Sequence, residues 1–300
     1  MALSGGPDST ALLHLTLDWA RDRNRRLTAL IVDHALRPES ADEAAATAAR
    51  AESAGVPAVV LRWSDAKPPR GMQAAAREAR YGLMLDWCRT NGAEALLLGH
   101  HLDDQAATVL MRMQRGSGPD GLSAMRPVSR RDTVLLLRPL LGIPKHALLD
   151  WLAARDLNYV EDPSNDLDAF ERNRLDRMLE AEDPDGGLRS RLGLLARRQA
   201  RAAAALEHAT DDAERRLLTM TDGAPVRIDL GGWLAEPGEI ALRLLARAIC
   251  HAGGRQPPLS ALERAGESLR NRTAANLGGV LIECRGEALT VRPEPERRQT

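Results

Sequence analysis

The feature that most constrains the fold is an alternation of short apolar runs with longer amphipathic segments over residues 1–140. The apolar runs predict strands at residues 27–32, 56–61, 95–98 and 133–137. The segments between them predict helices at residues 9–21, 40–54, 72–88 and 103–112. Continuous apolar strands that alternate with helices are typical of a parallel sheet with helices on both faces. The sequence therefore predicts an α/β domain built on a doubly wound parallel sheet.

The remaining residues predict a helical linker followed by a small α+β domain. A helix is expected at residues 144–155, and a turn-rich boundary at 183–187 precedes a long Ala/Arg-rich helix over about 188–218. Later elements are an extended segment at 226–230, helices at 240–251 and 259–269, a Gly278-Gly279 turn, and strands at 280–284 and 288–291. We place the domains at residues 1–180 and 187–300, because 300 residues suffice for two modest domains.

The run Ser4-Gly5-Gly6-Pro7-Asp8-Ser9-Thr10, called here the glycine loop, has the composition of a phosphate-binding loop. Adjacent glycines accept positive φ and let the backbone approach an anion closely. Ser9 or Thr10 is expected to cap the next helix, whose free N–H groups and positive dipole end then face the anion. The spacing matches neither a Walker A loop nor a G-x-G-x-x-G motif. An ordinary glycine-containing turn is the alternative.

Other polar residues also follow predicted strands. Asp33-His34 comes after one strand and His100-His101 after another, and ligands of parallel sheets bind beyond the carboxyl ends of the strands. Asp103 and Asp104 follow the histidines closely, so this group has the chemistry to bind a metal or orient a nucleotide. One interpretation is a two-metal phosphoesterase that uses Asp33-His34 and residues 100–104. The alternative for the aspartates is helix capping.

Charge and cysteine content give weaker constraints. The net charge is −1, and only Lys67 and Lys145 among the 41 basic residues are lysines. Arginine suits phosphate contacts, and clusters at residues 23–26, 130–131 and 189–201 either bind nucleic acid or are solvated helix faces. The three cysteines are isolated, and no signal or membrane-spanning segment is evident, which favours a cytoplasmic protein without structural zinc, an iron–sulfur cluster or disulfides. Only residues 1–3 precede the glycine loop, so the first strand is either very short or begins upstream.

Together these motifs resemble the N-type ATP pyrophosphatases, or PP-loop proteins, and within them the tRNA(Ile)-lysidine synthetase family. The matching blocks are residues 4–9, 32–37, 76–81, 100–106, 115–118 with 121–122, 138–141, 162–165 and 170–174. They occur in the family's order and cover residues 1 to about 180. Two features depart from the family pattern. Ala107 stands where the family usually carries Glu, and the C-terminal region matches only loosely, without room for the third domain of longer members.

The resemblance implies an adenine nucleotide alpha hydrolase-like fold and a ligase activity. Such a ligase uses ATP with Mg²⁺ to adenylate O2 of cytidine 34 in tRNA(Ile) with a CAU anticodon. It then joins L-lysine at C2, forming lysidine and releasing AMP and pyrophosphate. No membrane partner is implied, and the oligomeric state is left open, with a homodimer among the options.

The resemblance also implies roles for individual residues. For ATP the expected residues are Ser4, Gly5, Gly6, Pro7, Asp8, Ser9, Asp33 and His34, with Asp8 also holding Mg²⁺. Asp8, His100, Asp103 and Asp104 are expected in catalysis, and Arg77, Arg80, Arg172 and Arg174 in contacts with the tRNA.

Three other functions compete with this interpretation. The phosphoesterase predicts bound manganese or zinc and hydrolysis without lysine. A tRNA-thiolating relative is disfavoured by the lack of paired cysteines. A non-catalytic tRNA-binding module predicts that the change Asp8→Ala leaves the protein's role intact.

Overall fold

The computed structural model describes residues 1–68, 70–160, 171–221 and 223–294. It divides into two compact units: Met1–Arg115 with Leu122–Arg197, and Gly116–Gly121 with Arg198–Thr300. The division falls within the long helix α8 (Gly187–Leu217), whereas the sequence placed the domain boundary at 180–187. Among the described residues, no helix is both long and apolar enough to cross a membrane.

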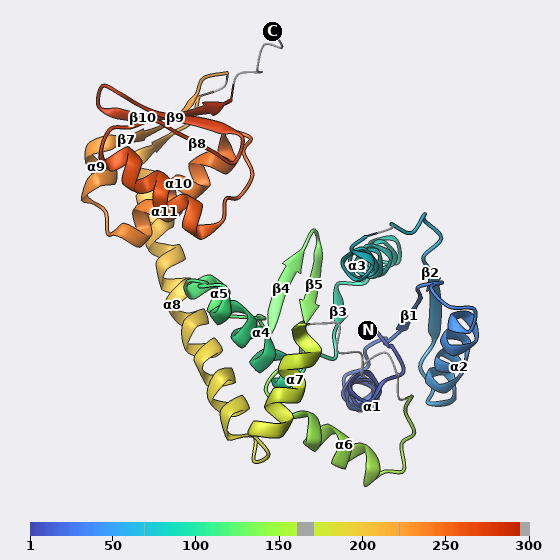
Figure 1. The fold of residues 1–300 in the computed structure, drawn as a ribbon. Helices are drawn as coiled ribbons and strands as arrows, with labels where there is room; N and C mark the ends of the chain where they lie inside the picture. The colour runs from blue at the N-terminus through green and yellow to red at the C-terminus, as the bar shows by residue number, and fades with distance from the viewer. Residues whose placement is uncertain (69, 161–170, 222, 295–300) are drawn as a thin grey trace. The chain divides into compact units, whose positions relative to one another are not determined.

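The first unit is built on a largely parallel sheet (Figure 1). Strand β1 (Ala29–Asp33) pairs in parallel with β2 (Ala58–Arg62), and β3 (Ala95–Leu97) pairs in parallel with β5 (Val134–Leu137). Strand β4 (Val128–Arg131) is antiparallel to β5. Residues 1–3 join the two halves, because the Ala2 amide donates to Leu97 O at 2.9 Å and the Leu30 amide donates to Met1 O at 2.7 Å. The hydrogen-bonded order is therefore β2, β1, residues 1–3, β3, β5 and β4.

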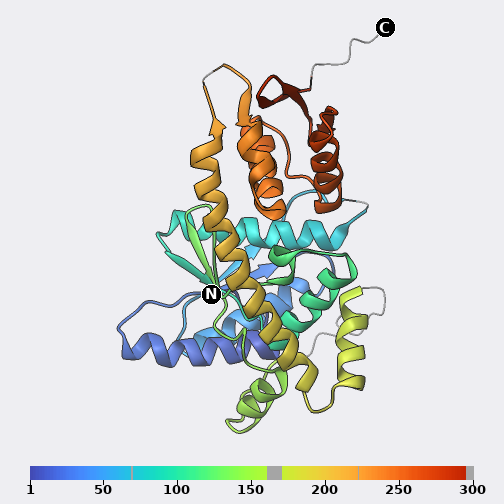
Figure 2. The ribbon, with the colours of Figure 1, turned by 90° about the vertical axis from the view of Figure 1, so that its left-hand side faces the viewer.

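Helices cover both faces of this sheet because its strands alternate their side chains (Figure 2). Ala29 and Ile31 of β1 pack in one core with α1 (Pro7–Asp22), α2 (Ser40–Ser53) and α6 (Lys145–Ala153). Leu30 points the other way and packs with Tyr81, Met84 and other residues of α3 (Met72–Thr90). The doubly wound α/β fold predicted from the sequence is thus confirmed.

A smaller core lies among three helices of this unit. Ala106 and Val109 of α4 (Leu102–Gln114) pack against Leu179 of α7 (Glu171–Glu182) and Leu192 of α8. Two short elements, α5 (Pro119–Leu122) and β4, were not expected from the sequence. Strand β4 has the sequence Val-Ser-Arg-Arg and is mostly exposed at the sheet edge, so it lacks the apolar pattern of the other strands.

The second unit contains an antiparallel sheet ordered β6 (Leu218–Thr219), β7 (Val226–Asp229), β10 (Ala288–Pro293), β9 (Val280–Arg285) and β8 (Ala275–Leu277). Its helices are α9 (Leu230–Ala235), α10 (Gly238–His251) and α11 (Leu259–Arg270). Trp233, Leu245 and Ile249 are fully buried in the core that these helices form with the sheet. The predicted small α+β architecture is therefore present.

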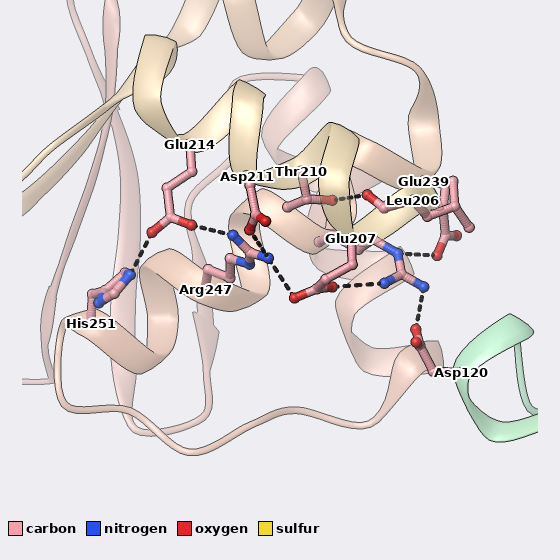
Figure 3. Close-up of polar contacts among 10 residues, drawn as sticks. Asp120, Leu206, Glu207, Thr210, Asp211, Glu214, Glu239, Arg247 and His251 are labelled. Atoms are coloured by element: carbon pink, nitrogen blue, oxygen red, sulfur yellow. Dashed lines mark hydrogen bonds and ion pairs between the residues drawn. The ribbon is translucent and has the colours of Figure 1, made fainter. Parts of the chain in front are cut away.

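Ion pairs join α8 to α10 within the second unit (Figure 3). Arg247 pairs with Glu207, Asp211 and Glu214, and the contacts with these carboxylates outweigh burial and raise the pKa of its guanidinium. Arg243 pairs with Glu239 at 2.9 Å and Glu207 at 3.2 Å, and also with Asp120. These arginines are occupied by protein carboxylates, so they are structural residues of this unit.

The first unit makes a direct prediction about stability. Leu30 is 1% exposed in the middle of the sheet, whereas Val60 on the outer strand β2 is 43% exposed. We expect Leu30→Ala to lower the free energy of unfolding by about 2–5 kcal/mol, because it leaves a cavity. Val60→Ala should lower it by less than about 1 kcal/mol. Urea unfolding followed by circular dichroism measures both, and equal effects would contradict this assignment of the core.

Candidate active site

The glycine loop turns directly into α1. Gly6 is the N-cap residue and Pro7 the first helical residue, with no side-chain cap. The prediction that Ser9 or Thr10 caps the helix is wrong, because Pro7 has the φ angle that a helix start requires and begins the helix two residues earlier. Instead, Ser9 folds the loop: its hydroxyl accepts from the Ser4 amide at 3.2 Å and donates to Gly6 O at 3.1 Å.

The bend leaves a set of backbone donors available. Within the described part of the chain, the amides of Gly5, Gly6, Asp8 and Ser9 donate to no protein acceptor. Gly5 has a φ of +86°, and the amide of Val160 donates to its carbonyl at 2.9 Å, which fixes the turn. A Cβ at Gly99 would lie only 3.3 Å from the Asp8 and Ser9 backbone, so glycine permits this close packing. Free amides at a helix N-terminus bind anions, and phosphate fits this arrangement.

Next to the loop, the buried ring of His101 lies among three carboxylates. Its Nε2 is 3.6 Å from Asp8 Oδ2 and 3.5 Å from Asp104 Oδ2, and its Nδ1 is 3.8 Å from Asp103 Oδ2. His101 is also the N-cap of α4, and its amide donates to Asp104 Oδ2 at 2.9 Å. We call these four residues the His101 cluster. The capping alternative considered for the aspartates is thus realised by Asp104.

The electrostatics of the cluster favour a charged imidazole. Burial lowers the pKa of His101, but the contacts with Asp103, Asp8 and Asp104 outweigh it and raise the pKa to about 10. Burial raises the pKa of Asp103, but His101, the Lys145 amide and Arg189 together hold it below its usual value. At neutral pH the cluster therefore contains an imidazolium cation beside ionised Asp103.

Asp8 is suited to magnesium. Its Oδ1 is buried and has no hydrogen-bond partner among the described residues, while Oδ2 faces His101. The described residues contain no group of three or more His, Cys, Asp or Glu side chains arranged to hold a metal ion. An ion at Asp8 would therefore take most of its ligands from phosphate and water, as Mg²⁺ commonly does.

The Asp33 carboxylate stabilises a local turn. Its Oδ1 accepts hydrogen bonds from the Ala35 amide at 2.8 Å and the Ser40 hydroxyl at 2.7 Å, and its Oδ2 lies 3.6 Å from Arg62. The carboxylate thus closes the turn between β1 and α2. The structure does not join Asp33-His34 and residues 100–104 into one metal centre within its described part, and the two-metal phosphoesterase receives no support.

His34 belongs to a cationic region beside α3. Burial and the charge of Arg80 lower the pKa of His34, Asp33 raises it, and Lys67 lowers it further. The His34 ring is edge-on to Trp63 with centroids 6.4 Å apart, and Lys67 Nζ lies 3.5 Å from the Trp63 ring centroid. Trp63 and Lys67 were not predicted from the sequence to belong to the site. Lys67 offered a signal, because it is one of only two lysines.

The predicted tRNA-contacting arginines fall in two places. Arg77 and Arg80 lie 5.3 Å and 5.7 Å from the Tyr81 ring on α3, and the Nε of Arg80 is buried without a partner among the described residues. Arg174 is exposed on α7. The side chain of Arg172 and the motif at 162–165 lie outside the described part of the structure, as does residue 170.

Three further findings concern the segment around α4. The sequence assigned catalysis to His100, which is half-buried, whereas the buried His101 occupies the centre of the cluster. Ala107, which replaces the family's Glu, is completely buried in α4. Arg189, grouped by the sequence with a basic stripe, is buried and pairs with Asp103.

Gly5 provides a test of the loop. A Cβ at this position would lie 2.8 Å from Thr47 Oγ1, in addition to the strain of positive φ. We expect Gly5→Ala to weaken binding of a non-hydrolysable ATP analogue at least about tenfold, since strain of about 1–2 kcal/mol and a steric overlap act together. Gly92→Ala is the control, because Gly92 also has positive φ but open space around it. Calorimetric titration would contradict the assignment if both variants bound equally well.

Asp33 provides a test of pH dependence. Burial raises the pKa of Asp33, but the bonds from Ser40 and Ala35 and the charge of Arg62 hold it below its usual value. A carboxylate with a lowered folded-state pKa stabilises the fold at neutral pH, and this contribution is lost as the pH falls through that pKa. Acidification below about pH 4 should therefore destabilise the wild type more than Asp33→Asn. Unfolding titrations across pH measure this difference, with the exposed Asp65→Asn as a control that should behave like the wild type.

Comparison with known proteins agrees with this geometry. The sequence model of the PP-loop domain family matches residues 1–182. The tRNA(Ile)-lysidine synthase of Bradyrhizobium diazoefficiens is 42% identical over 326 residues, which cover 100% of this chain and 90% of that protein. The tRNA(Ile)-lysidine synthase of Rhodopseudomonas palustris is 41% identical over 314 residues, covering 99% of this chain and 91% of that protein.

One solved structure shares the fold. The U34-tRNA thiolase NcsA from Methanococcus maripaludis, solved with its 4Fe–4S cluster, aligns with a TM-score of 0.57 and 20% identity. The alignment covers 66% of this chain and 70% of that one. From these sequence matches, the chain belongs to the PP-loop proteins and, within them, to the tRNA(Ile)-lysidine synthase family.

Proposed function

We propose that this protein is a ligase that uses ATP to join L-lysine to C2 of cytidine 34 in tRNA(Ile) with a CAU anticodon. The observation that carries the proposal is the set of glycine-loop amides beside Oδ1 of Asp8, none of which has a hydrogen-bond partner among the described residues. Membership of the tRNA(Ile)-lysidine synthase family supports it. ATP and tRNA are cytoplasmic substrates, and we place the reaction in that compartment.

The chemistry requires two steps, because the C2 oxygen of cytidine is amide-like and does not leave unaided. In the first, O2 attacks the α-phosphorus of ATP. The new O2–phosphorus bond forms as the bond from the α-phosphorus to the bridging oxygen breaks and pyrophosphate leaves with the electron pair. In the second, the neutral ε-amine of lysine attacks C2, and the C2–O2 bond breaks with release of AMP.

The glycine loop serves the first step. Its amides, that of Ser9 included, and the Ser4 hydroxyl donate to the β- and γ-phosphates and stabilise the charge that develops on pyrophosphate, while the Ser9 hydroxyl donates to Gly6 O and shapes the loop. Asp8 provides a carboxylate for magnesium, which neutralises phosphate charge when bound. Pro7 contributes by starting α1 directly after the glycines, so the helix N-terminus faces the same anion.

The aspartates and His100 serve the second step. Lysine is protonated in water and must lose a proton before it attacks. An aspartate of this segment, Asp103 or Asp104, accepts that proton. Asp103 supplies negative charge that attracts the ammonium group, and His100 orients the substrates from the start of α4.

The cationic region holds the remaining substrate groups. Adenosine lies against the Asp33-His34 turn, where the lowered pKa of His34 keeps the imidazole uncharged. Arg77 and Arg80, with Arg172 and Arg174, contact phosphates or the flipped base, because cytidine 34 must leave the anticodon stack to be modified. We assign residues 1–180 to catalysis and 187–300 to tRNA binding.

A single assay tests the proposal. The protein is incubated with a CAU tRNA(Ile) transcript, ATP, Mg²⁺ and labelled lysine, and the tRNA is digested to nucleosides. We expect label in the nucleoside from position 34 and none in a matched transcript with guanosine there. Absence of label would overturn the proposal, and phosphate release without tRNA or lysine would favour a phosphoesterase.

Asp8 should be essential to the first step. We expect Asp8→Asn to lower the rate of pyrophosphate release by about 10²–10³-fold, because one preorganised electrostatic group is lost at the reacting phosphate. Asp18→Asn, an exposed change on the same helix, is the control and should leave the rate unchanged. Equal rates for Asp8→Asn and wild type would argue for a non-catalytic binding module.

A further inference from the structure

Arg189 is a buried cation at the first turn of α8. Its Nε lies 3.2 Å from Asp103 Oδ1, and its Nη1 donates to Asp183 O at 2.7 Å and lies 3.5 Å from Asp183 Oδ2. Its side chain is only 11% exposed. Because a buried charge requires partners, the two acidic residues fix where this guanidinium lies. Such an arginine does not have the free, exposed side chain expected of a nucleic-acid-binding stripe.

The contact with Asp103 connects Arg189 to the glycine loop. Asp103 Oδ2 accepts from the Lys145 amide at 3.1 Å and lies 3.8 Å from His101 Nδ1. His101 Nε2 then faces Asp8 Oδ2 at 3.6 Å. Each member of the series Arg189, Asp103, His101 and Asp8 has a charge opposite to that of its neighbour. The series runs from the start of α8 to the carboxylate beside the free amides.

Among the described contacts, the carboxylates of Asp8, Asp103, Asp104 and Asp183 lie against the two cations His101 and Arg189. Without Arg189, the partners of Asp103 among the described residues would be His101 and the Lys145 amide. His101 would then be drawn toward Asp103, and its hold on Asp8 Oδ2 would weaken.

We propose that Arg189 is a positioning residue for the adenylation step, acting through Asp103 and His101 to fix Asp8. With Oδ2 of Asp8 engaged by His101, its Oδ1 stays unpaired for magnesium held with ATP. The inference rests on the proposed function, in which Asp8 provides the magnesium ligand. It removes Arg189 from the basic stripe and makes the first turn of α8 part of the support of the active site.

The test compares nucleotide binding with and without magnesium. We expect Arg189→Met to weaken binding of a non-hydrolysable ATP analogue about tenfold with Mg²⁺, and less than about twofold with EDTA, because a displaced reacting group costs up to about 10²-fold. The rate of pyrophosphate release should fall about 10–100-fold. Arg189→Lys should be intermediate, since an ammonium cannot reproduce the two-sided guanidinium contact. Arg50→Met, an exposed arginine on α2, should match wild type.

Two results would overturn the proposal. One is wild-type binding and rates in Arg189→Met. The other is an equal loss of affinity with and without Mg²⁺, because that result would indicate that Arg189 has a packing role only. If Arg189→Met does not unfold cooperatively, Asp103→Asn alone is compared with Asp103→Asn combined with Arg189→Met. The proposal requires that the second change add less than about twofold in that background. Binding is measured without tRNA or lysine, so absence of lysidine in the wild type would count against the proposed function separately.

Discussion

Three residues at the start of the chain hold the active site in place. The backbone of residues 1–3 pairs with β1 on one side and with the end of β3 on the other, so it completes the sheet. The glycine loop follows immediately and reaches the carboxyl edge of the sheet. Asp33 ends β1 at this edge, and Gly99 follows β3 there. The loop therefore lies where a parallel sheet gathers its ligand-binding residues.

The second constraint is electrostatic. Bringing the half-buried carboxylates of Asp8, Asp103 and Asp104 close together would be unfavourable without cations, and His101 supplies one at the centre. Arg189 supplies another from α8, while a backbone amide adds a neutral donor to Asp103. This arrangement keeps Asp103 ionised and holds Asp8 by one oxygen. The glycine loop thus presents hydrogen-bond donors that suit an anion, and the neighbouring His101 cluster presents negative charge that suits a cation.

Much of the fold could be predicted from the sequence because buried strands carry uninterrupted apolar runs. Strand β4 was missed since an exposed edge strand needs no such run. The helix start at Pro7 was misplaced, because Ser9 looked like a cap but its hydroxyl bonds within the loop. At the site, the motif directed attention to His100. Only burial and distances single out His101, because adjacent histidines look alike in a sequence.

The sequence by itself determined the fold class, the family and the position of the glycine loop, because these depend on local patterns and on motifs in a fixed order. Tertiary structure decided which side chains meet. Arg189 lies 86 positions after Asp103, and no local pattern predicts that they pair. Contacts between distant segments depend on how the elements pack, and packing is a property of the whole chain.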